Sequence, residues 1–254
     1  MSRHYYFCTL ILLFSGCIAV FHRNEFKRGI EFYNKGNFSE ATAHFNVYYY
    51  KHPASETTLY YLYDCYQKLN QPEQGIQVLQ ALAKLGSNDE NVYLNLFRYY
   101  HGHAQYDEMY QLMINLKPQV KQTLDKKYIL NRRSFAEIIS GGLGKAGNTN
   151  PVLFAIKQGY LELMPDGKFY DNDPMTNANL IISLDRLVAP IYPKKFFPTK
   201  NISNHSFLYL PYVRLVELGI LDFNPDLNPD GNATISMATS AIANLKKQGF
   251  IGVR

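Results

Sequence analysis

A recurrence in which position i is repeated at position i+34 constrains the fold of this chain more than any other sequence feature. The first unit carries small residues where two helices would touch and large residues that would fill the groove between them. Its marker positions are Gly29, Phe32, Gly36, Phe38, Ala41, Phe45 and Pro53. The markers of the next unit, shifted by the same period, are Tyr63, Tyr66, Pro72, Gly75, Leu79 and Ser87. This period predicts a stack of helical hairpins.

Local patterns within this region support the same prediction. One stripe of an amphipathic helix is formed by Leu59, Leu62, Tyr63 and Tyr66. Breaks between helices are expected at residues 70–72 and 85–88. A third unit is traced through Val92, Leu96, Tyr99, Tyr106 and Leu112, ending near Pro118. Because Cys65 falls on the apolar stripe, we expect it to be a buried structural thiol.

The offsets resemble those of the tetratricopeptide repeat (TPR). This resemblance implies a TPR-like array of about three repeats over residues 22–118, with a concave face that binds a protein partner. More tyrosines are present than the apolar stripe requires, namely Tyr48, Tyr49, Tyr50, Tyr60, Tyr61, Tyr99 and Tyr100. They either fill gaps between helices or contact the partner. Tyr49, Tyr60 and Tyr99 are the candidates for the partner-binding face.

Residues 1–21 have the order of an export signal. Arg3 precedes an almost purely apolar run from Phe7 to Phe14, and small residues then precede Cys17. The segment ending at Cys17 resembles a bacterial lipobox, which implies lipidation of Cys17 and a membrane lipid anchor. An uncleaved anchor over residues 5–21 and simple cleavage after Ala19 are the alternatives. All three place the remaining chain outside the cytoplasm, in the cell envelope.

A second recurrence, from position i to position i+60, is present in the C-terminal half. Residues 151–178 align without a gap on residues 211–238, so that Gly159 falls on Gly219 and Pro165 on Pro225. Each unit predicts a short helix, a turn and a second helix. The loop 159–169 resembles that of the S-layer homology (SLH) module. The resemblance implies two SLH-like repeats, about 147–190 and 205–254, with a partial unit within 119–146.

The SLH family carries Thr-Arg-Ala-Glu at the start of the second helix, and its Arg binds acidic wall polysaccharide. Here the two clear units read Thr176-Asn-Ala-Asn179 and Ser236-Met-Ala-Thr239, without the Arg. Only Arg132, in the partial unit, keeps a cation, so Arg132 is the candidate polymer-binding residue. Residues 117–133 are basic and are expected to connect the two arrays. Residues 140–147 are expected to be a flexible helix-to-helix connection.

Net charge and the motifs present narrow the range of possible functions further. The net charge of +5 is too small to favour nucleic acid as a partner. No catalytic motif, cofactor motif or metal-ligand spacing is found, and the His101-x-His103 pair falls at a predicted bend. The fold expected is therefore mainly α-helical, with a TPR solenoid followed by a small SLH-like bundle. The function expected is a non-enzymatic envelope lipoprotein that acts as an adaptor. The alternative is a wall-polysaccharide anchor in which the array is a spacer.

Overall fold

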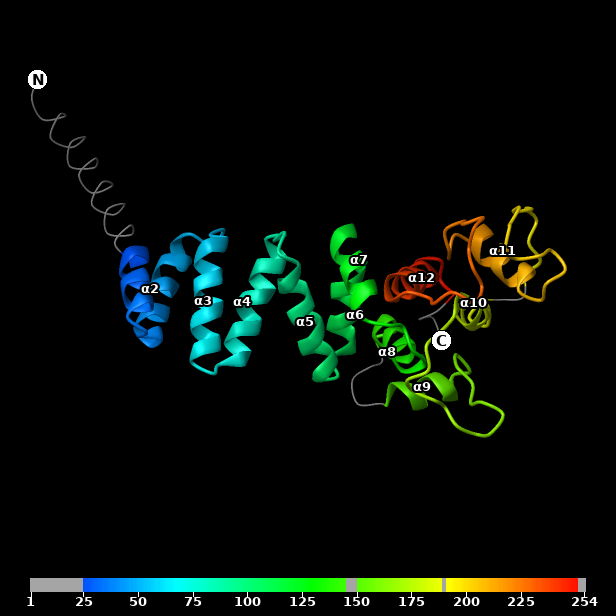
Figure 1. Ribbon diagram of the computed structural model, residues 1–254, viewed down its shortest axis with the longest axis horizontal. Coiled ribbons are helices and arrows are strands. Elements are labelled where there is room, and N and C mark those ends of the chain that lie inside the picture. The colour runs from blue at the N-terminus through cyan, green and yellow to red at the C-terminus, as the bar shows by residue number, and fades with distance from the viewer. Residues whose placement is uncertain (1–24, 145–149, 189–190, 251–254) are drawn as a thin grey trace, which may run out of the picture. The chain divides into compact units, whose positions relative to one another are not determined.

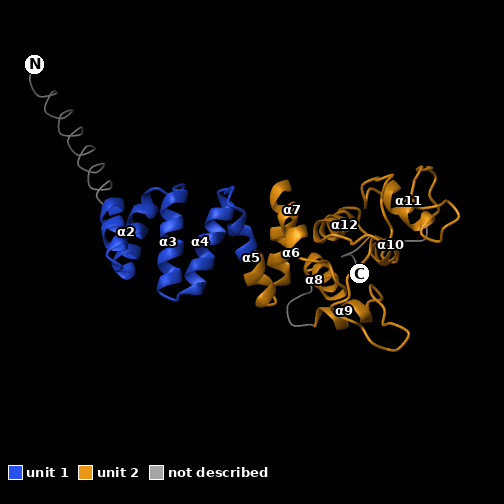
Figure 2. Cartoon of the chain, in the orientation of Figure 1, with its two compact units in different colours: residues 1–96 blue, residues 97–254 orange. Residues whose placement is uncertain are grey.

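The computed structural model describes residues 25–144, 150–188 and 191–250 (Figure 1). These residues are mainly α-helical, as predicted, and their only β pairing is two isolated bridges. The chain divides into two compact units, residues 1–96 and 97–254 (Figure 2). Helix α5 (Glu90–Gly102) contains the boundary between the units.

The first unit consists of helical hairpins. A helix over residues 25–34 is followed by α2 (Phe38–Lys51), α3 (Glu56–Lys68), α4 (Pro72–Lys84) and the first part of α5. Helix α3 packs against both α2 and α4. The side chains buried between these helices include Ala41, Phe45, Leu59, Leu62, Cys65, Val78, Leu79 and Leu82. Cys65 is fully buried as predicted, and this burial raises the pKa of its thiol.

Two features explain how the aromatic residues of this unit pack. Gly29 allows a close approach, because a Cβ atom there would lie 2.5 Å from Cε1 of Phe45. Tyr61 fills the space beyond, with its ring centroid 5.1 Å from those of both Tyr33 and Phe45. Part of the tyrosine excess therefore fills gaps between helices, which was one of the two roles expected.

The period of the first recurrence is visible in the backbone. Helices α2, α4 and α6 (Tyr106–Ile114) begin at Phe38, Pro72 and Tyr106, and both intervals are equal, because 72 − 38 = 34 and 106 − 72 = 34. Two positions before each start lies a residue in the left-handed region, and these are Gly36 (φ 77°), Asn70 (φ 52°) and Ala104 (φ 54°). The residue that follows each of them donates its backbone N–H to the carbonyl of Phe32, Tyr66 and Tyr100 respectively. The hairpin geometry therefore recurs three times.

This backbone register corrects two of the predicted markers of the third unit. Continued by one more period, Tyr63, Gly75 and Leu79 correspond to Phe97, Met109 and Met113, and these three side chains are all buried. Tyr99 and Leu112, which the sequence pattern had suggested, are only partly buried. The other three predicted markers, Val92, Leu96 and Tyr106, are buried. Several apolar residues occur in succession here, so local spacing alone does not distinguish Tyr99 from Phe97.

The second unit is built around α8 (Arg132–Gly142). Its other complete helices are α6, α7 (Pro118–Lys127), α9 (Pro151–Lys157), α10 (Asn177–Asp185), α11 (Tyr209–Glu217) and α12 (Ile235–Lys247). Helix α8 packs against α6, α9 and α12, and every residue from Phe135 to Gly142 is buried. The expected flexible connection at 140–147 is therefore wrong for residues 140–142, which complete a buried helix. Residues 145–149 lie outside the described part of the chain.

Three helix starts in this unit share one construction. Asn131, Thr176 and Thr234 are the N-caps of α8, α10 and α12, and each side chain accepts a hydrogen bond from the backbone N–H three positions later. The chain just before α10 bridges to Asn131, and the chain just before α12 bridges to Thr176. At the start of α12, the carboxylate of Asp125 on α7 accepts a further hydrogen bond, from the backbone N–H of Ser236 at 2.9 Å.

These caps correct the gap-free alignment of the two C-terminal repeats. The glycines that end the first helices, Gly159 (φ 72°) and Gly219 (φ 68°), do follow the predicted period, because 219 − 159 = 60. The N-caps Thr176 and Thr234 are closer together, because 234 − 176 = 58. The loop between glycine and cap is therefore shorter by two positions in the second repeat. The junction equivalent to residues 176–179 is 234–237 and not 236–239.

Candidate functional site

The three tyrosines expected to contact a partner are all partly buried. Tyr49 lies on α2, and Tyr60 lies on α3, where its hydroxyl is 2.8 Å from the Ser87 hydroxyl. The ring of Tyr99 on α5 stacks on His103, with centroids 4.1 Å apart. Tyr49 and Tyr60 belong to the first unit and Tyr99 to the second. The structure therefore defines no single surface that contains all three.

Arg132 is the first residue of α8 and directly follows the N-cap Asn131. Its Nε donates a hydrogen bond to the carbonyl oxygen of Phe169 at 2.7 Å, and Nη2 donates to the carbonyl oxygen of Glu162. The guanidinium also lies 4.6 Å from the centre of the Phe169 ring. Partial burial lowers the pKa of Arg132. Its side chain therefore holds the loop 162–169 in place.

An open pocket of about 390 Å³ lies beside Arg132. Arg186, the C-cap residue of α10, also lines it and forms an ion pair with Glu162 at 2.9 Å. Apolar walls are supplied by Leu161, Leu163, Ile182 and Phe207. The pocket thus contains two cations, but both already contact Glu162, Arg132 through its carbonyl and Arg186 through its carboxylate.

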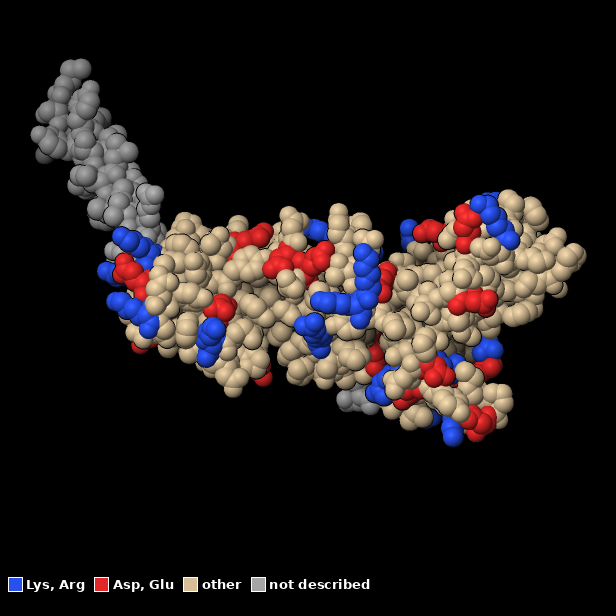
Figure 3. Space-filling model, viewed as in Figure 1, with Lys and Arg blue, Asp and Glu red and all other residues tan. Residues whose placement is uncertain are grey.

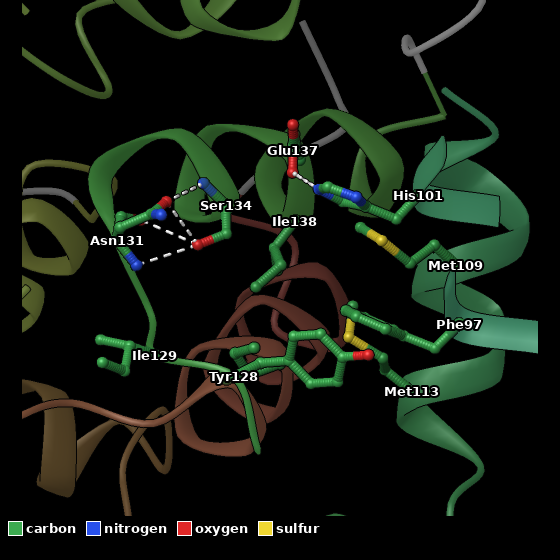
Figure 4. Close-up of a pocket in the computed structure, with 11 residues that line it drawn as sticks. Phe97, His101, Met109, Met113, Tyr128, Ile129, Asn131, Ser134, Glu137 and Ile138 are labelled. Atoms are coloured by element: carbon green, nitrogen blue, oxygen red, sulfur yellow. Dashed lines mark hydrogen bonds and ion pairs between the residues drawn. The ribbon is translucent and has the colours of Figure 1, made fainter. Parts of the chain in front are cut away.

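A second pocket, of about 150 Å³, is formed by the third hairpin and α8 (Figure 4). Phe97, Met109 and Met113 reach toward Ile138 from α5 and α6, as Figure 4 shows. The remaining apolar residues of the lining are Tyr128, Ile129 and Ile235. Ile129 is the most exposed of these apolar side chains, with 60% of its surface accessible. A cavity of this volume can hold one aromatic ring or a similar apolar group.

One edge of this pocket is charged. Glu137 is only 2% exposed, and its Oε1 accepts a hydrogen bond from Nε of Arg133 at 3.2 Å. Its Oε2 lies 3.1 Å from Nε2 of His101, and the two groups form an ion pair when the imidazole is protonated. The Glu137 carboxylate raises the pKa of His101, although partial burial of the imidazole opposes the shift. A ligand with an N–H donor could pair with Oε2.

Sequence reasoning missed this second pocket. The sequence places His101 only at a predicted bend of the third hairpin and assigns it no site. The described residues contain no group of three His, Cys, Asp or Glu side chains suited to a metal ion. Phe97, Met109 and Met113 could have been found by extending the first recurrence one further step from Tyr63, Gly75 and Leu79. No sequence pattern indicates that Glu137 is buried at this pocket, because its burial depends on the packing of α8.

The lipidation candidate, Cys17, and the signal-like segment 1–21 lie outside the described residues. Within the part of the chain that is described, no helix combines the length and apolar character needed to cross a bilayer. The mode of membrane attachment therefore stays a prediction from the sequence.

Comparison with known proteins gives no identification. No protein-family model matches the chain, and no curated protein matches it. The resemblances to TPR and SLH modules therefore depend on the motifs and spacings given above.

Proposed function

We propose that this chain is a non-enzymatic adaptor of a bacterial cell envelope, anchored by a lipid at Cys17, which recruits a protein through its helical hairpins. The observation that carries the proposal is the Met-lined pocket of the third hairpin. It is open to solvent, and Ile129 in its lining is exposed. Partner proteins commonly place one large apolar side chain into such a pocket, and methionines adapt to its shape.

The charged edge supports a peptide as the occupant. Oε2 of Glu137 is buried and lies 3.1 Å from Nε2 of His101, and a carboxylate oxygen can accept a further hydrogen bond from a backbone N–H or a basic side chain of the partner. The apolar lining next to it would take the side chain. This combination of one apolar anchor and one polar contact is typical of peptide recognition by helical scaffolds.

Site-specific photo-crosslinking in the native envelope tests the proposal. Benzoylphenylalanine would be placed in turn at Ile129, at the candidates Tyr49, Tyr60 and Tyr99, and at Leu163 as an exposed control in the same unit as Ile129. We expect one protein adduct of the same mass from Ile129 and from at least one of the tyrosines, and none from Leu163. The Tyr99 adduct should also weaken when Ile129→Asp alters the pocket lining.

The adaptor proposal fails if Ile129 and the tyrosines yield no protein adduct while the envelope location is retained. It also fails if Leu163 yields the same adduct with equal efficiency. Because Ile129 is exposed, Ile129→Asp is expected to leave the fold intact, and circular dichroism checks this directly.

A second candidate function is wall-polymer binding at Arg132. It is favoured by the position of Arg132 at the start of α8 and by Arg186 in the same pocket. Retention on purified wall polymer tests it. Because Arg132 also holds a loop, the informative variants are Arg132→Lys, which keeps the charge, and Arg186→Ala, which removes a charge without touching the loop carbonyls. Salt-sensitive retention that is lost in both variants would favour polymer binding over the adaptor role.

A further inference from the structure

The segment that leads into α11 has an unusual composition. Residues 186–216 contain five Lys or Arg residues and no Asp or Glu, although the chain as a whole has 21 acidic residues. Between Ile191 and Phe197 the sequence reads Ile-Tyr-Pro-Lys-Lys-Phe-Phe, which places two adjacent lysines between pairs of large apolar groups. In Figure 1 this segment includes the yellow loop beside α11.

The backbone of this loop is held in place. The Glu217 carboxylate of α11 accepts hydrogen bonds from the backbone N–H groups of Lys194 and Lys195, at 2.7 and 3.3 Å. Arg214 forms an ion pair with Asp185 at 2.7 Å and donates through Nε to the carbonyl of Ile191. The acidic residues of the neighbouring elements are thus engaged with the base of the loop.

The large side chains of the same loop nevertheless face outward. Tyr192 is 81% exposed, Phe196 is 71% exposed, and Phe207, just before α11, is 81% exposed. A loop that was merely filling space would turn such groups inward, because exposing them to water is unfavourable. Their exposure on a fixed backbone indicates a surface that another body covers.

The loop lies along α11, and two contacts fix its position there. The ring of Phe196 lies 6.1 Å from that of Tyr209, the first residue of α11, and Phe207 is two positions before it. Ile191 contacts Arg214, and the exposed Leu210 lies one turn earlier on the same helix face. We call Tyr192, Phe196, Phe207 and Leu210, with Lys194 and Lys195, the aromatic-basic patch. Figure 3 shows uncharged surface at the right-hand end of this view, beside a group of basic and acidic side chains at the upper right.

We propose that the aromatic-basic patch docks on the surface of an anionic lipid bilayer. Exposed lysines are disfavoured in protein–protein interfaces. Aromatic rings beside lysines are, in contrast, the combination found at the level of lipid headgroups, where the rings enter the interface and the ammonium groups meet phosphate. Among the described residues, no carboxylate forms an ion pair with Lys194 or Lys195, so their charges face the solvent. This contact is separate from any anchor at residues 1–21.

The sequence offers a direct reporter for this contact, because the chain has no tryptophan. Phe196→Trp introduces a single indole into the patch of the full chain, and Tyr50→Trp places one at an 85% exposed position in the first unit. On vesicles that contain phosphatidylglycerol, the Phe196→Trp emission should shift to shorter wavelength and be quenched by brominated lipid. On phosphatidylcholine vesicles both effects should be absent, and Tyr50→Trp should show neither effect on either type of vesicle.

Charge reversal supplies the second arm of the experiment. In the Phe196→Trp background, Lys194→Glu with Lys195→Glu should lower partitioning onto the anionic vesicles more than about tenfold. The matched control is Lys126→Glu with Lys127→Glu, another adjacent and exposed pair in the same unit. This control should reduce partitioning much less.

Three results would overturn the proposal. The first is unchanged Phe196→Trp emission on anionic vesicles. The second is equal quenching of Tyr50→Trp, because a membrane anchor elsewhere would then explain the proximity. The third is a photo-crosslinker at Phe196 that captures a protein while lipid quenching is absent, since the patch would then be a protein interface.

Discussion

Gly141 lies so close to the backbone of Tyr106 that a Cβ atom at Gly141 would be 2.1 Å from the Tyr106 carbonyl oxygen. The neighbouring Gly142 shows the same tightness toward α12, where a Cβ atom would be 2.5 Å from Cγ2 of Ile242. Two adjacent glycines thus set how closely α8 approaches both α6 and α12. In the interior of a helix, glycine is otherwise unfavourable by about 1 kcal/mol relative to alanine.

Gly141→Ala is therefore expected to destabilise the second unit by about 1–3 kcal/mol, although alanine is the better helix former. Urea unfolding followed by circular dichroism measures the change. Gly102→Ala is the control, because a Cβ atom at Gly102 would meet nothing within 4 Å. That variant should be neutral or slightly stabilising. Equal stability of the two variants would contradict the close approach of α6 and α8.

Ala104→Gly is expected to stabilise the protein. Ala104 has a φ of 54°, and this left-handed conformation costs an alanine about 1–2 kcal/mol. Part of this cost is offset by the greater freedom of glycine in the unfolded chain, so the net gain should be about 0.5–1 kcal/mol. The reverse change at the equivalent position, Gly36→Ala, should destabilise. Thermal midpoints of both variants test the pair, and a loss of stability in Ala104→Gly would refute the argument.

The ion pair between His101 and Glu137 should make stability depend on pH. Because the folded-state pKa of His101 is raised, its contribution is fully present below the unfolded-state pKa near 6.5 and is lost as the pH rises through the folded-state value. As the pH rises above about 6.5, the thermal midpoint should thus fall more in the native protein than in His101→Gln. NMR titration in Glu137→Gln should show the His101 pKa returning toward 6.5. A native imidazole that titrates at or below that value would contradict the prediction.

Lipidation at Cys17 can be tested with the chain's own cysteines. Cells supplied with labelled palmitate should yield labelled protein, and Cys17→Ser should abolish the label. Cys8→Ser and Cys65→Ser are matched controls that should retain it. Mass spectrometry of the N-terminus distinguishes the alternatives, since cleavage after Ala19 would leave Val20 as the first residue and an uncleaved anchor would retain Met1.

The sequence predicted the first unit well because its signals are local. Period, apolar spacing and turn residues are properties of neighbouring positions, and helix α4 begins at Pro72 where the break was expected. Of the five markers predicted for the third hairpin, Val92, Leu96 and Tyr106 are buried, whereas Tyr99 and Leu112 are only partly buried. The apolar residues of this hairpin are so frequent that local spacing does not choose between Tyr99 and Phe97. Strict continuation of the period from i to i+34 would have made that choice.

The second unit was less predictable because its decisive contacts are distant in sequence. The position of Thr234 as an N-cap depends on a loop that is two positions shorter than its counterpart, and a gap-free alignment hides that difference. The glycines 141 and 142 suggested a flexible connection, whereas the packing of α6 and α12 makes them part of a buried helix. Glu137 is buried for the same reason. No pattern near these residues carries that information.

The linked helix starts of the second unit have a consequence for how it unfolds. The first backbone N–H groups of α8 donate hydrogen bonds to the carbonyl oxygens of residues 171 and 173. Those of α10 donate to the carbonyl oxygens of residues 229 and 231, and one backbone N–H group of α12 donates to the carboxylate of Asp125 on α7. Each helix therefore relies on a segment that lies far away along the chain. Loss of any one segment deprives the next helix of acceptors, so this unit should melt in a single cooperative transition and resist stepwise proteolytic trimming from its C-terminal side.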